Sequence, residues 1–144
     1  MKRKISSRIL LSLGLVFVLG SAITQVQGGN PWDQQLPVVT IYSTGNVNRG
    51  KTGSFVLSMN PKLMLGGTYV NFSVSGTAVP GVDYVALVSP ASVGPSGYAV
   101  LLIKALPDRR APADRQSYSV EVKLDSGQGY ALGQPDSATM WIRP

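Results

Sequence analysis

The chain has 144 residues, with 13 Lys and Arg against 7 Asp and Glu, and it contains no His and no Cys. The lack of His and Cys excludes Ser-His-Asp and Cys-His catalysis, zinc sites built on these residues, thiol redox chemistry and disulfides. The net charge of +6 would suggest nucleic-acid binding, but four of the basic residues lie within the first eight positions. The remainder carries nine basic and seven acidic residues, or +2. Nucleic acid is therefore not expected as a partner.

The first 28 residues predict a Sec-type signal peptide. A basic start is followed by an apolar core of 11 residues, Ile9–Leu19. A spanning helix needs roughly 20 apolar residues, so an uncleaved membrane anchor is the less favoured alternative, and no stable membrane span is expected after cleavage. Small residues predict cleavage after Ala22 or after Gly28, so that the mature protein begins at Ile23 or Gly29. We therefore expect a secreted, periplasmic or cell-envelope protein, most consistent with a bacterial origin.

Residues 29–37 predict a polar, proline-bounded linker, and residues 38–144 predict one all-β domain. The run Tyr98–Leu106 is apolar on both faces, which is typical of a central strand covered on both sides. Short strands separated by Gly, Pro, Asn and Ser turns favour an immunoglobulin-like β-sandwich of about seven antiparallel strands, with no helix after the leader. The predicted strands are Val38–Ser43, Ser54–Met59, Tyr69–Ser75, Tyr84–Val88, Tyr98–Leu106, Gln116–Leu124 and Ala138–Ile142.

Two segments of the chain resemble the Calx-beta domain. Tyr69–Tyr84, YVNFSVSGTAVPGVDY, has the alternating strand and the G-T-A-x-x-G-x-D-Y run of that family. Gln116–Ile142 is similar to its closing hairpin, with an alternating strand, a Gly-containing loop and the pair Leu132-Gly133. The resemblance covers roughly residues 38–142 and is weak before Phe55. It implies the same sandwich and a role as a calcium-binding, adhesive or spacer module.

The resemblance also implies where a calcium ion would lie. In the family, acidic residues from several loops hold the metal at one end of the sandwich. One family ligand matches Asp83. The family's Asp-Asp pair falls on Asp108 and Arg109, so only its first member is acidic here. The family's early acidic ligand falls in the loop 43–53, which contains no Asp or Glu. Calcium takes six to eight oxygen ligands, so two remaining carboxylates do not suffice. We expect that the metal site is lost and that the protein has no cofactor. The alternative is a weak, noncanonical calcium site.

Two interpretations of the nearby arginines remain open. In one, Arg109 or Arg110 takes the place of the missing cation and pairs with Asp83 and Asp108, because the guanidinium fork fits carboxylates. In the other, the arginines stay in water and Asp83 accepts hydrogen bonds from backbone amides of its own turn.

No enzyme is expected, because no Ser-x-x-Lys motif exists after the leader and the spacing of the acidic residues suggests no catalytic pair. The sequence predicts an exported, non-enzymatic binding or structural module of the bacterial cell envelope or secretome that acts through surface contacts. A calcium-dependent adhesive module is the alternative. Tyr69 and Trp141 lie on the outward rows of their strands, which makes them candidate contact residues for a protein or a surface glycan.

Overall fold

The computed structural model describes residues 35–63 and 65–144. The chain divides into two units, Met1–Gln35 and Leu36–Pro144, and all strands described below belong to the second. The predicted signal peptide and most of the predicted linker lie outside the described residues. Within the described part of the chain, no helix is long and apolar enough to cross a membrane.

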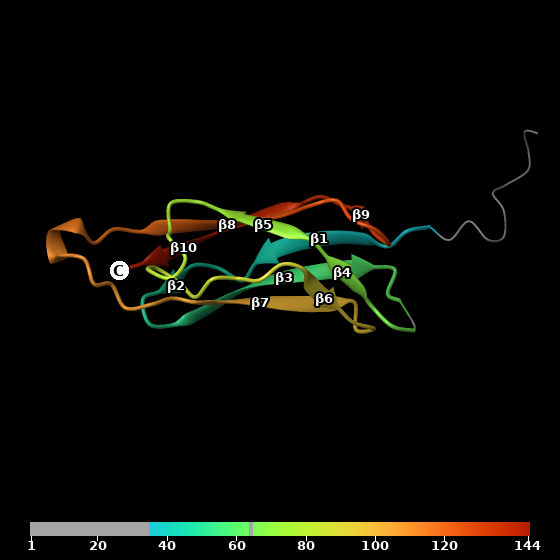
Figure 1. Ribbon diagram of the computed structural model, residues 1–144, viewed down its shortest axis with the longest axis horizontal. Helices are drawn as coiled ribbons and strands as arrows, with labels where there is room; N and C mark the ends of the chain where they lie inside the picture. The colour runs from blue at the N-terminus through green and yellow to red at the C-terminus, as the bar shows by residue number, and fades with distance from the viewer. Residues whose placement is uncertain (1–34, 64) are drawn as a thin grey trace, which may run out of the picture. The chain divides into compact units, whose positions relative to one another are not determined.

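Ten strands and one turn of 3₁₀ helix make up the described secondary structure (Figure 1). They are β1 (Val38–Ser43), β2 (Val47–Asn48), β3 (Thr52–Asn60), β4 (Thr68–Val70), β5 (Phe72–Ser75), β6 (Ala91–Val93), β7 (Tyr98–Lys104), η1 (Pro112–Asp114), β8 (Tyr118–Leu124), β9 (Ala131–Leu132) and β10 (Ser137–Arg143).

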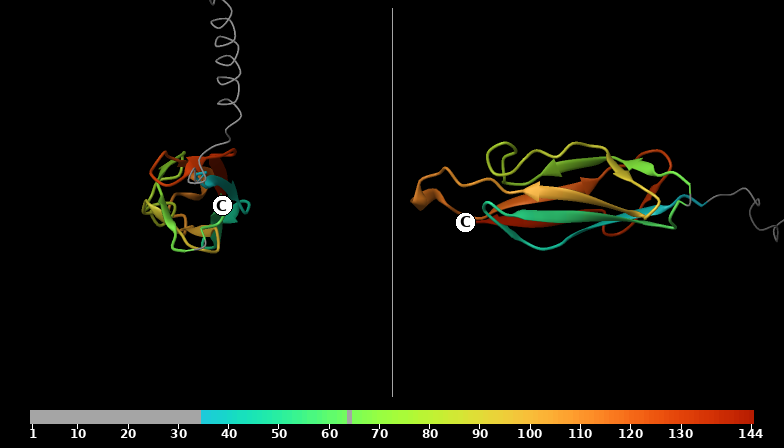
Figure 2. Two further views of the ribbon diagram at one scale, coloured as in Figure 1. Left: turned by 90° about the vertical axis from the view of Figure 1, so that its right-hand side faces the viewer. Right: turned by 90° about the horizontal axis from the view of Figure 1, so that it is seen from below.

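The strands form two four-stranded sheets that enclose one core. The first sheet has the order β7-β3-β1-β9 and the second has the order β2-β10-β8-β5. Neighbouring strands are antiparallel, except that β9 joins β1 and β2 joins β10 in parallel. A small third sheet pairs β4 with β6. The end-on view in Figure 2 shows the strands arranged around a common interior. The predicted all-β sandwich is confirmed.

The core is built from the alternate apolar residues of each strand, as expected for sheets with one face in water. In β1 and β3, Val39, Ile41, Phe55 and Leu57 are fully buried. The second sheet contributes a matching set of buried side chains, which are Phe72, Val120, Val122, Leu124, Met140 and Ile142. These inward rows agree with the alternation in the sequence.

The prediction of a strand at Tyr84–Val88 is wrong. Only Tyr84 takes part in β-bridges there, with Pro80 and with Ala105. The Val85 amide still donates to the Lys104 carbonyl beside β7, but further along the Ser89 hydroxyl accepts from the Phe72 amide at the start of β5. The segment therefore crosses from the edge of one sheet to the edge of the other, and it cannot remain paired with either.

The prediction that Tyr98–Leu106 is a central, doubly covered strand is also wrong. The strand β7 ends at Lys104 and lies at the end of its sheet. Leu101 and Ile103 point into the core, whereas the outward Val100 and Leu102 are 56% and 60% exposed. The apolar residues on the second face therefore mark an apolar patch on the surface and not a second layer above the sheet.

The predicted strand Tyr69–Ser75 is divided in two at Asn71. Val70 pairs with Ala91 in the small sheet, whereas Phe72 pairs with Leu124 in the large one. The Asn71 amide donates to the Tyr130 hydroxyl at 3.1 Å, which satisfies the backbone at the break. The alternating side chains are uninterrupted because the chain changes its hydrogen-bond partner without changing its inward face.

Three connections meet at one end of the sandwich, beside the C-terminus in Figure 1. They are the β2–β3 connection, the turn after β5, and the long connection from β7 to β8 that contains η1. Backbone hydrogen bonds join them, since the Gly50 amide donates to the Ala105 carbonyl and the Leu106 amide donates to the Asp83 carbonyl. This end of the sandwich brings together Arg49, Asp83, Asp108 and Arg110.

Candidate functional site

Asp83 has no exposed surface and is the one charged residue among the described residues that is buried as a whole, backbone included. The turn that presents it follows β5 and depends on Gly76, whose φ of 117° favours glycine. A Cβ at Gly76 would also collide with the Ser119 carbonyl. Within the turn, the Asp83 amide donates to the Val79 carbonyl, and the Val79 amide donates to Asp83 Oδ2 at 2.7 Å. The turn thus satisfies one carboxylate oxygen from its own backbone.

Arg110 binds the Asp83 carboxylate through both Nη atoms of its guanidinium group. Arg110 Nη1 lies 2.6 Å from Asp83 Oδ1, and Arg110 Nη2 lies 3.1 Å from Oδ2. Arg110 Nη1 also reaches Asp108 Oδ1 at 3.2 Å. This is the bidentate arrangement in which Arg–carboxylate pairs are strongest and most directional. Arg110 therefore joins two carboxylates that come from different connections.

Arg49 is a second bridge to the same two carboxylates. Arg49 Nη2 lies 2.7 Å from Asp83 Oδ1 and 3.4 Å from Asp108 Oδ2. Its Nη1 donates to the backbone carbonyls of Asp83 and Leu106, each at 3.4 Å. The side chain is only 8% exposed. Arg49 thus ties the β2–β3 connection to the other two.

The Tyr118 ring at the start of β8 covers the two guanidinium groups. The guanidinium carbon of Arg110 lies 4.1 Å from the ring centroid, and that of Arg49 lies 5.5 Å from it. Both distances are within the range of cation–π attraction. We call Arg49, Asp83, Asp108, Arg110 and Tyr118 the arginine–aspartate cluster.

The charges of the cluster reinforce one another. Burial would raise the pKa of Asp83, but hydrogen bonds from Arg110, the Val79 amide and Arg49 outweigh it and lower that pKa to about 2. The backbone amide of Arg110, together with the two arginine side chains, also lowers the pKa of Asp108. The hydrogen bond to Asp83 raises the pKa of Arg110 above its ordinary value. Both carboxylates are therefore ionised at neutral pH.

The structure brings together three of the four charged residues singled out in the sequence. Asp83, Asp108 and Arg110 are in direct contact, whereas Arg109 is exposed and makes no ion pair with a described residue. Arg49 was not predicted, because the resemblance directs attention only to acidic residues in the loop 43–53. The signal was available, since Arg49 and Lys51 are the two cations of that loop.

The two candidate contact residues lie on different sheets. Tyr69 belongs to β4 of the small sheet and is 69% exposed, and Trp141 belongs to β10 and is 45% exposed. Trp141 stands opposite Ser119 on β8, and its amide donates to the Asn46 side chain. Both rings are therefore exposed to solvent, and they lie on different sheets instead of in one surface patch.

The cluster offers a metal ion few free ligands. Asp83 Oδ1 accepts hydrogen bonds from both arginines, and Asp83 Oδ2 accepts from Arg110 and from the Val79 amide. Within the described residues, no group of three or more His, Cys, Asp or Glu side chains is placed to hold a metal. A cation at this position would have to displace two guanidinium groups.

Comparisons with known proteins do not identify a family for this chain. No family model matches the sequence, and no curated protein matches it. Among solved structures, the chain is similar to the CARDB domain of a protein from Pyrococcus furiosus, crystallised in complex with di-metal ions. The TM-score is 0.47 and the identity 16%, over 75% of this chain and 93% of that chain. The fold class therefore rests on the strand order and the core described above.

Proposed function

We propose that the protein is an exported, non-enzymatic module that acts through surface contacts, and that two arginines stabilise its end loops where related domains use calcium. The observation that carries this proposal is the Asp83 carboxylate, which is fully buried and has both oxygens occupied by Arg49, Arg110 and a backbone amide. Such a carboxylate is a structural anchor and has no free lone pair directed at solvent.

The proposed relation to Calx-beta domains is supported by the position of each cluster residue. Asp83 and Asp108 stand where the resemblance places two calcium ligands. Arg49 lies in the loop where it places an early acidic ligand, and Arg110 follows the position of the Asp-Asp pair. In this account, an acidic ligand has been replaced by a cation, and the carboxylates that remain have kept their places.

Electrostatics favours the arginines over a divalent ion. A guanidinium about 6 Å from a divalent cation would cost roughly 5 kcal/mol at an effective dielectric constant of 20. Two guanidinium groups already lie within hydrogen-bond distance of Asp83. Calcium binding would therefore require both arginines to leave carboxylates with which they make short, charge-assisted bonds.

The proposal that the module is not an enzyme is supported by the direction of its pKa shifts. An efficient general acid or base has a pKa near the working pH. The pKa values of Asp83 and Asp108 move down and that of Tyr84 moves up, so each moves away from neutrality. The most perturbed groups of the described chain are thus held in one protonation state.

Surface contact through Trp141 and Tyr69 is the proposed mode of action, with an envelope protein or a surface glycan as partner. Binding of the fluorescently labelled protein to isolated cell envelopes, in calcium and in EDTA, tests this. We expect binding that is equal in both buffers and weakened by Trp141→Ala or Tyr69→Ala. Tyr42→Ala, which removes a comparably exposed ring on β1, serves as the control. Binding that disappears in EDTA would favour the calcium-dependent adhesive module instead.

A further inference from the structure

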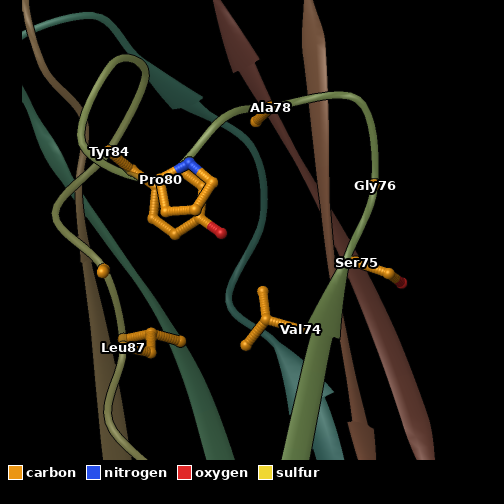
Figure 3. Close-up of a pocket in the computed structure, with 8 residues that line it drawn as sticks. Val74, Ser75, Gly76, Ala78, Pro80, Tyr84 and Leu87 are labelled. Atoms are coloured by element: carbon orange, nitrogen blue, oxygen red, sulfur yellow. The ribbon is translucent and has the colours of Figure 1, made fainter.

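A pocket lies where the strand β5 and the segment after Tyr84 diverge (Figure 3). It has a volume of about 250 Å³. Its lining contains no charged side chain and consists of Val74, Ser75, Gly76, Ala78, Pro80, Tyr84, Ala86 and Leu87. The side chains of Val74 and Leu87 point toward one another across the space. The pocket is separate from the arginine–aspartate cluster, although Tyr84 follows Asp83 in sequence.

The Tyr84 hydroxyl is directed into this pocket, away from the backbone of its own turn. Tyr84 is only 3% exposed, and Figure 3 shows its oxygen pointing into the space between Val74 and Leu87. Among the described residues, none forms a hydrogen bond with that oxygen. The hydroxyl oxygen is not one of the buried unpaired atoms of the described residues, so it is accessible from the pocket, where it can bond to water or to a ligand.

The chemistry of the lining restricts the ligand. Burial and the nearby charge of Asp83 raise the pKa of Tyr84, so the hydroxyl stays protonated at neutral pH and can donate a hydrogen bond. Apart from Ser75, whose side chain points away from the space in Figure 3, the lining side chains near it are apolar or small, and no cation in the lining could neutralise an anion. The pocket is larger than the engineered cavity of about 150 Å³ that binds benzene, but smaller than most sites for drug-sized molecules.

A second observation shows why the pocket is open on the β5 side. The Asp125 amide donates to the Asn71 carbonyl. In an antiparallel pair this means that the backbone amides and carbonyls of odd-numbered residues in β5 point toward β8, and those of even-numbered residues point away from it. The Phe72 amide accordingly reaches the Ser89 hydroxyl on the other side. At Val74 the two segments have separated, so its outward backbone groups border the pocket. The opening follows from the diagonal path of the chain after Tyr84.

We propose that this pocket binds a small uncharged molecule with one ring or a short branched apolar body and one hydrogen-bond acceptor, which accepts a hydrogen bond from the Tyr84 hydroxyl. The apolar body lies between Val74 and Leu87, and the acceptor faces the hydroxyl. This binding site goes beyond the proposed surface-contact function and does not depend on it.

Titration of the protein with acetophenone, followed by the backbone amide signals of Val74, Gly76 and Leu87 in a ¹H–¹⁵N correlation spectrum, tests the proposal. Toluene lacks the acceptor and benzoate carries a charge, so both should bind more weakly. Tyr84→Phe removes only the unpaired oxygen and should weaken acetophenone binding about 3- to 10-fold, the range of one hydrogen bond, while leaving toluene binding unchanged. Tyr98→Phe, on an exposed tyrosine of β7, is the matched control and should change neither.

Three results would overturn the proposal. The first is that acetophenone shifts none of the three signals up to its solubility limit. The second is that toluene binds as tightly as acetophenone, and the third is that Tyr84→Phe binds acetophenone as well as the unmodified protein. Because Tyr84→Phe leaves the ring in place and breaks no hydrogen bond with a described residue, its melting temperature should equal that of the unmodified protein.

Discussion

Arg110 and Asp83 form a two-pronged ion pair at the end of the sandwich, with Nη1–Oδ1 and Nη2–Oδ2 distances of 2.6 and 3.1 Å. The pair connects residues 27 positions apart in sequence, and Arg49 shares the Oδ1 atom from a third connection. Removing one arginine leaves carboxylate charge without part of its compensation in a site shielded from water.

The neighbouring arginines 109 and 110 should differ in their effect on stability. Arg110→Gln removes the bidentate bonds to Asp83 and the stacking on Tyr118, so we expect the melting temperature to fall by several degrees. Arg109→Gln changes an exposed side chain and should leave it almost unchanged. Differential scanning calorimetry measures the melting temperatures of both variants. A melting temperature of Arg110→Gln as little changed as that of Arg109→Gln would mean that Arg110 is a solvated loop charge.

Arg49 and Asp83 should be energetically coupled. Arg49→Met should lower the free energy of unfolding by about 3 kcal/mol, because it leaves a buried carboxylate short of a partner. In the Asp83→Asn background the same substitution should cost less, because the charge that needed compensation is absent. Urea denaturation of the two single variants and the double variant measures the coupling. Additive losses would contradict the cluster.

The stability of the protein should depend on pH through Asp83. Its pKa is about 2 in the folded protein and ordinarily 3.8, so the ionised form favours the folded state. The difference of roughly 2 units corresponds to about 2.5 kcal/mol, which is present above pH 3.8 and is lost as the pH falls through 3.8 toward 2. Urea denaturation between pH 7 and pH 2 should therefore show a steeper loss for the unmodified protein than for Asp83→Asn. If the free energy of unfolding fell equally with pH in both proteins, Asp83 would not contribute to the loss of stability in acid.

Much of the fold could be predicted from the sequence, because alternation reports directly which side chains are buried. The buried rows of β1, β3, β8 and β10 follow the apolar positions in the chain. The apolar face of β7 was misleading, since alternation cannot distinguish a second covered face from an exposed apolar patch. The path after Tyr84 was not predictable either, because local apolar content does not reveal where a segment leaves one sheet for another.

The cluster could be predicted only in part. Asp83 and Asp108 stand in recognisable motif positions, and an arginine near Asp108 was an evident candidate partner. Arg49 is 34 positions from Asp83, and its contact depends on how the β2–β3 connection folds over the end of the sandwich. Choosing Arg110 over Arg109 likewise requires the direction of each side chain in an irregular connection, which has no periodicity to read.

The proposed replacement of calcium by arginine is tested most directly by the response of the melting temperature to calcium. A site with a dissociation constant of about 10 μM would add about 2.7 kcal/mol at 1 mM Ca²⁺, or several degrees. We expect no shift for the unmodified protein. The double variant Arg49→Gln, Arg110→Gln leaves the Asp83 and Asp108 charges without their guanidinium partners and should be stabilised by calcium relative to EDTA. A rise of several degrees in the unmodified protein that Asp83→Asn abolishes would contradict the replacement and establish a calcium site.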